Sequence, residues 1–292
     1  MADDITPLAS LSLTHVYYNP NDPISLLCAW LALVPQALCV VYVTLIWSTR
    51  EAEVALMFAG QLACEAVNFA LKRLIKEERP RHIHTTGGKG YGMPSSHSQF
   101  AFFWAVALGL FLLARHRPPP TKNSISHDAA AASTMQQQQT GTGSPPAAVA
   151  AAADDREGRQ RRQRAVILLR DIERFAHEPW SFAQRAAVSV VALGLACAVA
   201  WSRIYLGYHT PKQVLAGVAA GSVSAVGWFA ITYMVRQAGL LVWALEMPVA
   251  RWFRLRDLVV EEDLCQAGWE KWETQRLASR QQQSETKKRK TT

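Results

Sequence analysis

The chain has 292 residues and a formal net charge of +8, and half of its residues are hydrophobic although its mean hydropathy is zero. Strongly apolar stretches are therefore averaged against strongly polar ones, whereas a soluble globular domain would mix them more evenly. Ten tryptophans and an excess of Lys and Arg fit a membrane protein, because tryptophan collects at membrane interfaces and cations mark the cytosolic side. We expect no nucleic-acid partner.

The five cysteines show no spacing typical of a disulfide framework or a zinc site. Cys28, Cys39, Cys64 and Cys197 lie in apolar segments, and Cys265 stands in a charged region. No CxxC pair and no Cys/His ligand spacing occurs. We expect small buried side chains here, with no metal and no other cofactor.

Residues 1–23 form an N-terminal segment that contains no Lys or Arg. It carries Asp3, Asp4 and Asp22 instead. A cleavable signal peptide needs a positively charged start, so none is expected.

Five apolar stretches are long enough, or nearly so, to cross the hydrocarbon core, which takes about 20 residues of helix. They run over residues 24–47, 54–71, 100–114, 186–201 and 214–235. A sixth stretch, 240–250, contains Glu246 and Pro248 and is too short to span. The sequence predicts an all-α integral membrane bundle with about five transmembrane helices and a short sixth helix at the interface.

A segment of different composition separates the third and fourth stretches, within a loop over residues 116–180. Residues 117–164 hold runs of Pro, Ala and Gln followed by an Arg-rich run. Such composition buries too little apolar surface to offset the entropy of ordering, so disorder is expected. Both a solvated linker and a partner-binding or regulatory insert remain open.

The distribution of cations predicts the topology. Ten Lys and Arg lie between Arg115 and Arg174 and eleven from Arg236 to the end, against none in residues 1–23. The positive-inside rule places the N-terminus outside the cytosol, and the loop 116–180 and the tail 251–292 inside it. The segments 24–115 and 181–250 then hold three and two spans. Three polar motifs described next fall on the non-cytosolic face, where cations would serve an anion.

The first motif is Lys72 with Arg79 and Pro80, which reads K-x6-R-P. If the helix continued that far, seven residues would make nearly two turns, and both cations would lie on one side to clamp a phosphoryl group. The planar guanidinium of Arg can bind two phosphoryl oxygens at once, whereas the ammonium of Lys acts as a point charge. The alternative is a pair of ordinary interfacial anchors.

The second motif, Pro94-Ser95-Ser96-His97, leads into the third span. Ser95 and Ser96 can cap that helix, and its first backbone N–H groups make an anion site. His97 can supply a proton to a leaving oxygen. A plain helix cap followed by an interfacial histidine is the alternative.

The third motif ends the fourth span, where Ser202-Arg203 is followed by His209 and by Gln213. Another arginine and another histidine therefore reach the same membrane face. Each motif alone is ambiguous, but three on one face favour a site for an anion.

These motifs, in this order on a helical bundle, resemble the signature of the phosphatidic acid phosphatase type 2 / vanadium haloperoxidase superfamily. The sequence from Gly92 to Phe100 and that from Ser202 to Val214 most resemble the dolichyl diphosphate phosphatases of the endoplasmic reticulum membrane. The resemblance covers about residues 24–236 apart from the insert. It implies a metal-independent phosphohydrolase that converts dolichyl diphosphate to dolichyl phosphate through a phosphohistidine, recycling the carrier lipid of protein N-glycosylation.

The resemblance also implies a role for each motif residue. His209 would be the nucleophile, and His97 the acid that protonates the departing dolichyl phosphate. The phosphoryl oxygens would be held by Lys72, Arg79, Ser95, the N–H of Ser96 and Arg203.

Two positions depart from the superfamily pattern. Ser96 stands where Gly is usual, which matters little if only its N–H is used. Gln213 stands where an Asp usually orients the nucleophilic histidine. An amide can fix the imidazole tautomer but cannot stabilise an imidazolium as a carboxylate does. The resemblance implies that the dolichyl branch shares this Gln.

Other functions remain open from the sequence. One is a phosphatase for phosphatidate, a sphingoid-base phosphate or another prenyl diphosphate, and one is a non-catalytic lipid-binding membrane protein. A haloperoxidase is disfavoured because, by the resemblance, those proteins are largely soluble. Lys288 and Lys290 near the C-terminus resemble a dilysine retrieval signal of the endoplasmic reticulum, although a generic basic tail fits as well. The sequence does not predict the oligomeric state.

Overall fold

The computed structural model describes residues 9–11, 16–80, 90–116, 180–260, 264, 268–269 and 271–280. The chain divides into two compact units, Met1–His116 with Ser181–Val260 and Arg117–Trp180 with Glu261–Thr292. In the second unit, residues 271–280 are helical. The insert predicted over 117–164 and the two tail lysines lie outside the described residues.

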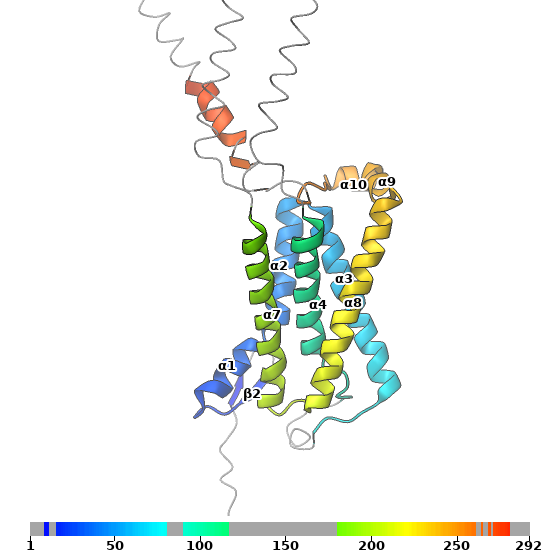
Figure 1. Ribbon diagram of the computed structural model, residues 1–292. Coiled ribbons are helices and arrows are strands. Elements are labelled where there is room, and N and C mark those ends of the chain that lie inside the picture. Colours follow the sequence, from blue (N-terminus) through cyan, green and yellow to red (C-terminus); the bar gives the residue numbers. More distant parts are fainter. Residues whose placement is uncertain are drawn as a thin grey trace, which may run out of the picture. The chain divides into compact units, whose positions relative to one another are not determined.

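The first unit is a bundle of upright helices (Figure 1). Its elements are β1 (Ala9–Leu11), β2 (Val16–Tyr18), α1 (Pro23–Leu31), α2 (Val34–Thr49), α3 (Ala52–Ile75), α4 (Ser96–Leu110), the π-helical turn η2 (Phe111–Arg115), α7 (Phe182–Tyr205), α8 (Pro211–Gln237), α9 (Leu240–Glu246) and α10 (Pro248–Trp252).

Five helical stretches of the described chain are long and apolar enough to cross a membrane, which confirms the predicted all-α membrane bundle. They are Pro23–Thr49, Ala52–Ile75, Ser96–Arg115, Phe182–Tyr205 and Pro211–Gln237. Each begins and ends up to four residues beyond the predicted stretch. The reason is that polar residues such as Lys72, Ser96 and Arg203 remain helical at the helix ends, where an apolar window stops.

The predicted sixth stretch forms two short helices, α9 and α10, which lie across one end of the bundle (Figure 1). They part at Met247, which precedes Pro248 and is extended, as a residue before proline tends to be. Trp243 and Trp252 are 60% and 78% exposed. Exposed tryptophans at the end of a membrane bundle are typical of a helix lying in the interface.

A two-stranded antiparallel hairpin precedes the first helix and was not predicted. β1 pairs with β2 so that Ala9 lies opposite Tyr18. Val16 is buried with Ala29 and Ala32 of the α1 region, and Leu206 and Tyr208 pack against them. Strands of three residues are too short to show the alternation by which a strand is recognised.

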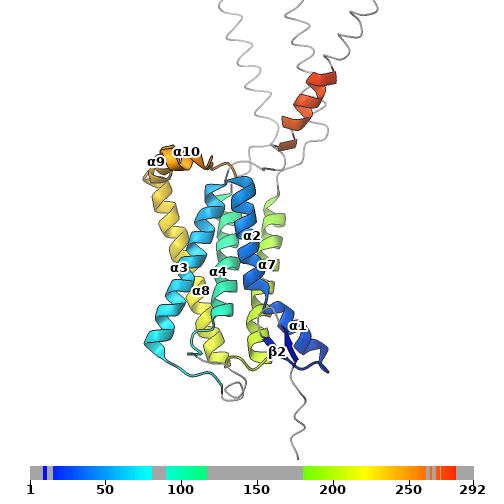
Figure 2. The same ribbon diagram turned by 180° about the vertical axis from the view of Figure 1, so that it is seen from behind.

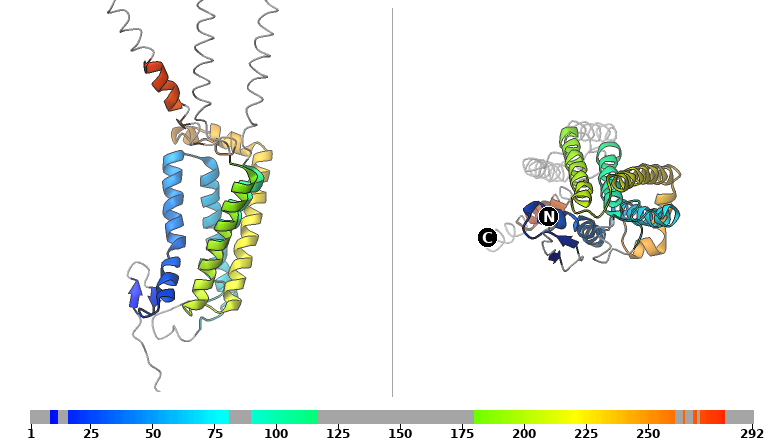
Figure 3. Two further views of the ribbon diagram at one scale, coloured as in Figure 1. Left: turned by 60° about the vertical axis from the view of Figure 1, so that its left-hand side comes forward. Right: turned by 90° about the horizontal axis from the view of Figure 1, so that it is seen from below.

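α4 is the central helix of the unit, in contact with α3, α7 and α8 (Figures 2 and 3). It packs backbone to backbone against α8: a Cβ atom built on Gly217 would lie only 2.6 Å from the carbonyl oxygen of Ser95. A glycine is therefore required at Gly217. This close approach places the first turns of α4 and α8 side by side.

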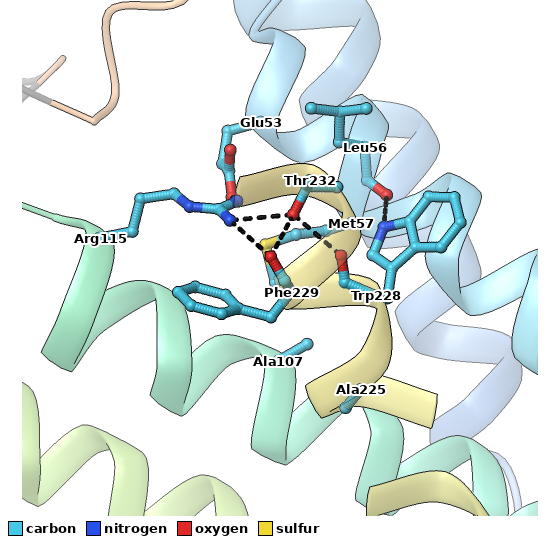
Figure 4. A pocket seen from close by; sticks show the side chains of 9 residues that line it. All are labelled: Glu53, Leu56, Met57, Ala107, Arg115, Ala225, Trp228, Phe229 and Thr232. Carbon is cyan, nitrogen blue, oxygen red and sulfur yellow. Dashed lines mark hydrogen bonds and ion pairs between the residues drawn. The ribbon is translucent and has the colours of Figure 1, made fainter. Parts of the chain in front are cut away.

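A buried ionic network closes the opposite end of the bundle (Figure 4). Glu53, only 2% exposed, forms ion pairs with Arg115 and Arg236. Arg115 also donates to the hydroxyl of Thr232 at 2.9 Å and lies over the ring of Phe229. The two arginines lie 62 and 183 residues from Glu53 along the sequence. The network could therefore not be predicted from the sequence.

Replacing Glu53 with glutamine is expected to lower the stability of the protein strongly. The change leaves two arginines facing a neutral amide, and breaking a buried ion pair costs about 3–5 kcal/mol. Thermal unfolding in detergent should therefore begin at a clearly lower temperature. The control is Glu246→Gln, because Glu246 is exposed at the end of α9. Equal melting temperatures for the two variants would contradict a stabilising role for Glu53.

Candidate active site

The residues of the three motifs meet at one end of the bundle, where α3 and α7 end and α4 and α8 begin (Figures 1 and 2). Lys72 lies in the last turn of α3, and Arg203 lies in the last turn of α7. His97 is in the first turn of α4 and Gln213 in the first turn of α8. His209 lies in the short connection between α7 and α8.

Arg79 lies beyond the end of α3, in a non-helical segment that follows a change of chain direction. α3 ends at Ile75, and Lys76 follows with a left-handed φ of 53°, its N–H bonded to the carbonyl of Lys72. The condition for placing Lys72 and Arg79 on one side of a helix is therefore not met, because the helix does not extend to Arg79. The segment after Lys76 is held instead by Gly92, whose N–H donates to the carbonyl of Glu77 at 2.7 Å.

The beginning of α4 differs in one respect from the expectation. Ser95 occupies the N-cap position and is fully buried, but its side chain makes no capping hydrogen bond. Its hydroxyl accepts from the hydroxyl of Ser98 at 3.1 Å, and its N–H donates to the carbonyl of Gln213 at 3.1 Å. The Ser95 side chain therefore does not satisfy the first N–H groups of α4, which suit an anion.

His209 is buried, and its imidazole lies within hydrogen-bond distance of Gln213. It is 4% exposed, and its Nδ1 lies 3.2 Å from Oε1 of Gln213. Burial, together with the positive charges of Arg203 and Arg79, lowers the pKa of His209 to about 3, although the hydrogen bond with Gln213 acts in the opposite direction. The imidazole is therefore neutral at neutral pH, the form that can attack phosphorus.

Arg203 presents unused hydrogen-bond donors to the same space. It is 4% exposed and lies over the ring of Tyr208 at 4.3 Å. Tyr208 is fixed in turn by the N-terminal hairpin, because its hydroxyl accepts from the N–H of Tyr17 at 2.9 Å. Within the described part of the chain, Nε and Nη1 of Arg203 have no hydrogen-bond partner. A buried guanidinium in this state suits an anionic ligand.

Electrostatic interactions tie the motif residues into one cluster. His209 interacts with Arg203, Arg79 and Lys72, and His97 interacts with Arg203, His209 and Lys72. The structure therefore brings all three motifs together. Three cations and two imidazoles around one space can bind a phosphoryl group, attack it and protonate what leaves.

His97 is oriented by a feature that sequence reasoning missed. Its ring makes a hydrogen bond with the backbone of Ala32. Ala32 lies in the break between α1, which ends at Leu31, and α2, which begins at Val34. Pro35 near the start of α2 has no N–H to donate into the preceding turn. The only signal in the sequence was this proline inside an apolar span.

A pocket of about 270 Å³ opens beside His97. Its lining comes from α2, α3 and the beginning of α4, and consists of Pro35, Gln36, Cys39, Glu65, Ser96, His97 and Phe100. The pocket thus extends from the candidate acid toward helices that would face lipid. Among the described residues, no group of three His, Cys, Asp or Glu side chains is placed to hold a metal ion.

A second set of missed residues fixes α4 against α3. Gln99 is fully buried, and its amide donates to the carbonyl of Cys64 at 2.8 Å and accepts from Asn68 at 2.7 Å. These bonds set the position of the turn that carries His97. The signal that could have identified them was Asn68, a polar residue inside the apolar stretch 54–71.

Comparison with known proteins places the chain in a family. The PAP2 superfamily profile matches residues 53–237. A Neurospora crassa protein named "Putative dolichyldiphosphatase" is 74% identical over 281 residues, covering 96% of this chain and 97% of that protein. The chain belongs to the dolichyldiphosphatases of the PAP2 superfamily. Human Dolichyldiphosphatase 1 is 32% identical over 248 residues, covering 85% and 81% of the two chains, and Dictyostelium discoideum Dolichyldiphosphatase 1 is 29% identical over 260 residues, covering 89% and 87%.

Membership among the dolichyldiphosphatases makes the chain a membrane-bound hydrolase of phosphoric anhydrides. No solved structure matches the chain. The profile begins at Glu53 and ends at Gln237, so it contains every residue of the three motifs.

Proposed function

We propose that this protein hydrolyses dolichyl diphosphate to dolichyl phosphate and phosphate through a phosphohistidine on His209, and so recycles the carrier lipid of protein N-glycosylation. The observation that carries the proposal is the buried pair of His209 and Arg203, in which a neutral imidazole lies beside a guanidinium with unused donors. The names of the relatives supply the substrate.

In the first step, the terminal phosphoryl group is bound and attacked. Its oxygens are held by Lys72, Arg79, Arg203, Ser95 and the N–H of Ser96. Nε2 of His209 forms a bond to phosphorus while the bond to the bridging oxygen breaks. His97 gives its proton to that oxygen, and dolichyl phosphate leaves. The cations stabilise the charge that develops on the phosphoryl oxygens.

In the second step, water hydrolyses the phosphohistidine. His97, now without its proton, accepts one from the attacking water, and the bond from phosphorus to Nε2 of His209 breaks. Phosphate departs and both histidines return to their starting states. No step requires a metal, as the resemblance implies.

The pocket beside His97 supports a lipid as the leaving group. The bridging oxygen must lie next to His97, so the dolichyl chain begins where the pocket opens. Pro35, Cys39 and Phe100 give it apolar walls. A chain leaving the site between α2 and α3 would pass directly into the bilayer.

We further propose that the active site faces the lumen of the endoplasmic reticulum. The N-terminal segment 1–23 would lie on the same side, and the loop 116–180 and the tail 251–292 in the cytosol. The charge distribution supports this orientation. The five spans support it too, because an odd number puts the N-terminus and the tail on opposite sides.

The test is a substrate panel with purified protein in detergent and EDTA. We expect the highest kcat/KM for dolichyl diphosphate, compared with farnesyl diphosphate, phosphatidate and sphingosine phosphate. A preference for phosphatidate or sphingosine phosphate would reassign the protein to another class of lipid phosphatase. The absence of phosphate release from every substrate would contradict catalysis itself.

A further inference from the structure

The amide of Gln213 has partners on all sides. Its Oε1 lies 3.2 Å from Nδ1 of His209 and accepts from the N–H of Thr210 at 3.3 Å. Its Nε2 donates to Oε1 of Glu77 at 3.1 Å and to the carbonyl of Glu78 at 2.8 Å. Reversing the amide would turn its nitrogen toward donors and its oxygen toward acceptors. The orientation of Gln213 is therefore fixed.

This orientation decides the tautomer of His209. An amide oxygen can only accept, so Nδ1 of His209 must carry the hydrogen. The lone pair is then on Nε2, the nitrogen free to attack phosphorus. The side chain of Glu77 and the backbone carbonyl of Glu78 thus select the reactive tautomer through Gln213, because they are the acceptors that hold the amide nitrogen away from the imidazole.

Glu77 brings a negative charge to this chain of hydrogen bonds. One carboxylate oxygen accepts from Gln213, and the other forms an ion pair with Lys212 at 3.0 Å. Hydrogen bonds from Lys212 and Gln213 lower the pKa of Glu77, so the carboxylate is ionised at neutral pH. Gly92 permits this packing, because a Cβ atom there would lie 2.8 Å from Nε2 of Gln213.

We propose that Glu77 is a positioning residue for the hydrolysis, supplying through the amide of Gln213 the carboxylate that the site lacks next to His209. The inference rests on the proposed function, since it takes His209 as the nucleophile. Attack on phosphorus makes the imidazole positive. A carboxylate behind a polarised amide favours that charge, because hydrogen bonds in a chain strengthen one another.

The first experiment compares Glu77→Gln with Glu78→Gln. Glutamine at position 77 keeps an oxygen for Gln213 but loses the charge. We expect kcat to fall about 10–100-fold, as for other partners that orient a ligand or catalytic group, with KM within a factor of about two. Glu78→Gln removes a neighbouring charge of the same sign, but the Gln213 amide meets Glu78 through the backbone carbonyl. Its kcat should stay near that of the wild type.

The second experiment exchanges the two side chains. Gln213→Glu alone sets two carboxylates against each other. Gln213→Glu combined with Glu77→Gln gives a carboxylate on Nδ1 of His209 and an amide behind it. The double variant should therefore be faster than the Gln213→Glu single variant, a non-additive rescue that lost structure would not produce. A double variant slower than that single variant would overturn the inference.

A readout without substrate separates the two proposals. The ¹⁵N and ¹H chemical shifts of the His209 imidazole at neutral pH should report the Nδ1–H tautomer in both the wild type and Glu77→Gln. The Nδ1 proton should resonate further upfield in Glu77→Gln, because without the charge behind it the amide of Gln213 accepts a weaker hydrogen bond. If that holds while no lipid diphosphate is hydrolysed, only the proposed function fails. If hydrolysis occurs but Glu77→Gln changes neither the Nδ1 proton shift nor kcat relative to Glu78→Gln, only the role of Glu77 fails.

Discussion

Replacing His209 with alanine is expected to reduce kcat for phosphate release from dolichyl diphosphate at least about 10⁴-fold, as removal of a nucleophile does in enzymes with covalent intermediates. Water would have to attack the phosphoryl group directly, without the second, easier step that the phosphohistidine provides. Substrate binding should change little, because Lys72, Arg79 and Arg203 remain. The measurement is single-turnover release of phosphate in EDTA.

The matched control for that variant is His116→Ala. His116 follows η2, at the end of the α4 span remote from His97, where its Nδ1 lies 3.1 Å from the carbonyl of Val259. It should retain wild-type turnover. Turnover by His209→Ala at a rate comparable with His116→Ala would remove His209 from the chemistry.

Replacing His97 with alanine is expected to reduce the single-turnover rate of dolichyl phosphate release about 10²–10⁴-fold, the usual contribution of a general acid. The loss should be much smaller for p-nitrophenyl phosphate, because nitrophenolate leaves without needing a proton. KM should change little if His97 acts on the departing oxygen. The measurement is the rate of leaving-group release in a single turnover, in wild type and variant, for the two substrates. This step precedes hydrolysis of the phosphohistidine, in which His97 also acts and which is the same for both substrates.

The comparison of leaving groups separates an acid from a merely structural residue. A distorted site would slow both substrates alike, whereas a missing proton donor slows only the poorer leaving group. Equal losses for dolichyl diphosphate and p-nitrophenyl phosphate would therefore show that His97 is not the acid. The melting temperature of the variant checks that the hydrogen bond to Ala32 is not needed for folding.

The membrane bundle could be predicted because apolar stretches of about 20 residues carry a strong local signal. The ends of the helices could not, since Lys72 and Arg203 are polar but remain helical at the edge of the site. The helix also stops before Arg79, so Lys72 and Arg79 do not share one helical face. Lys76 ends α3 in a left-handed conformation. A non-glycine residue seldom adopts this conformation, and no pattern in the sequence predicts it here.

The three motifs could be predicted to lie together because each places a charge or an imidazole at the end of a membrane helix. The residues that hydrogen-bond to the motif segments and hold them in place could not be predicted. Glu77 lies 136 residues from Gln213, and Tyr17 lies 191 residues from Tyr208. Contacts between residues so far apart in the sequence depend on how the helices pack. The sequence shows only that Gln213 is neutral, while the structure places Glu77 behind it.

The most direct test of the proposed mechanism is to trap the phosphoryl enzyme. Wild-type protein would be mixed with dolichyl diphosphate labelled in its terminal phosphoryl group and quenched in alkali, where phosphohistidine survives. The label would then be located by peptide mass spectrometry. We predict label on His209, and none in His209→Ala. Rapid turnover with no label on His209, or label on another residue, would contradict the phosphohistidine mechanism.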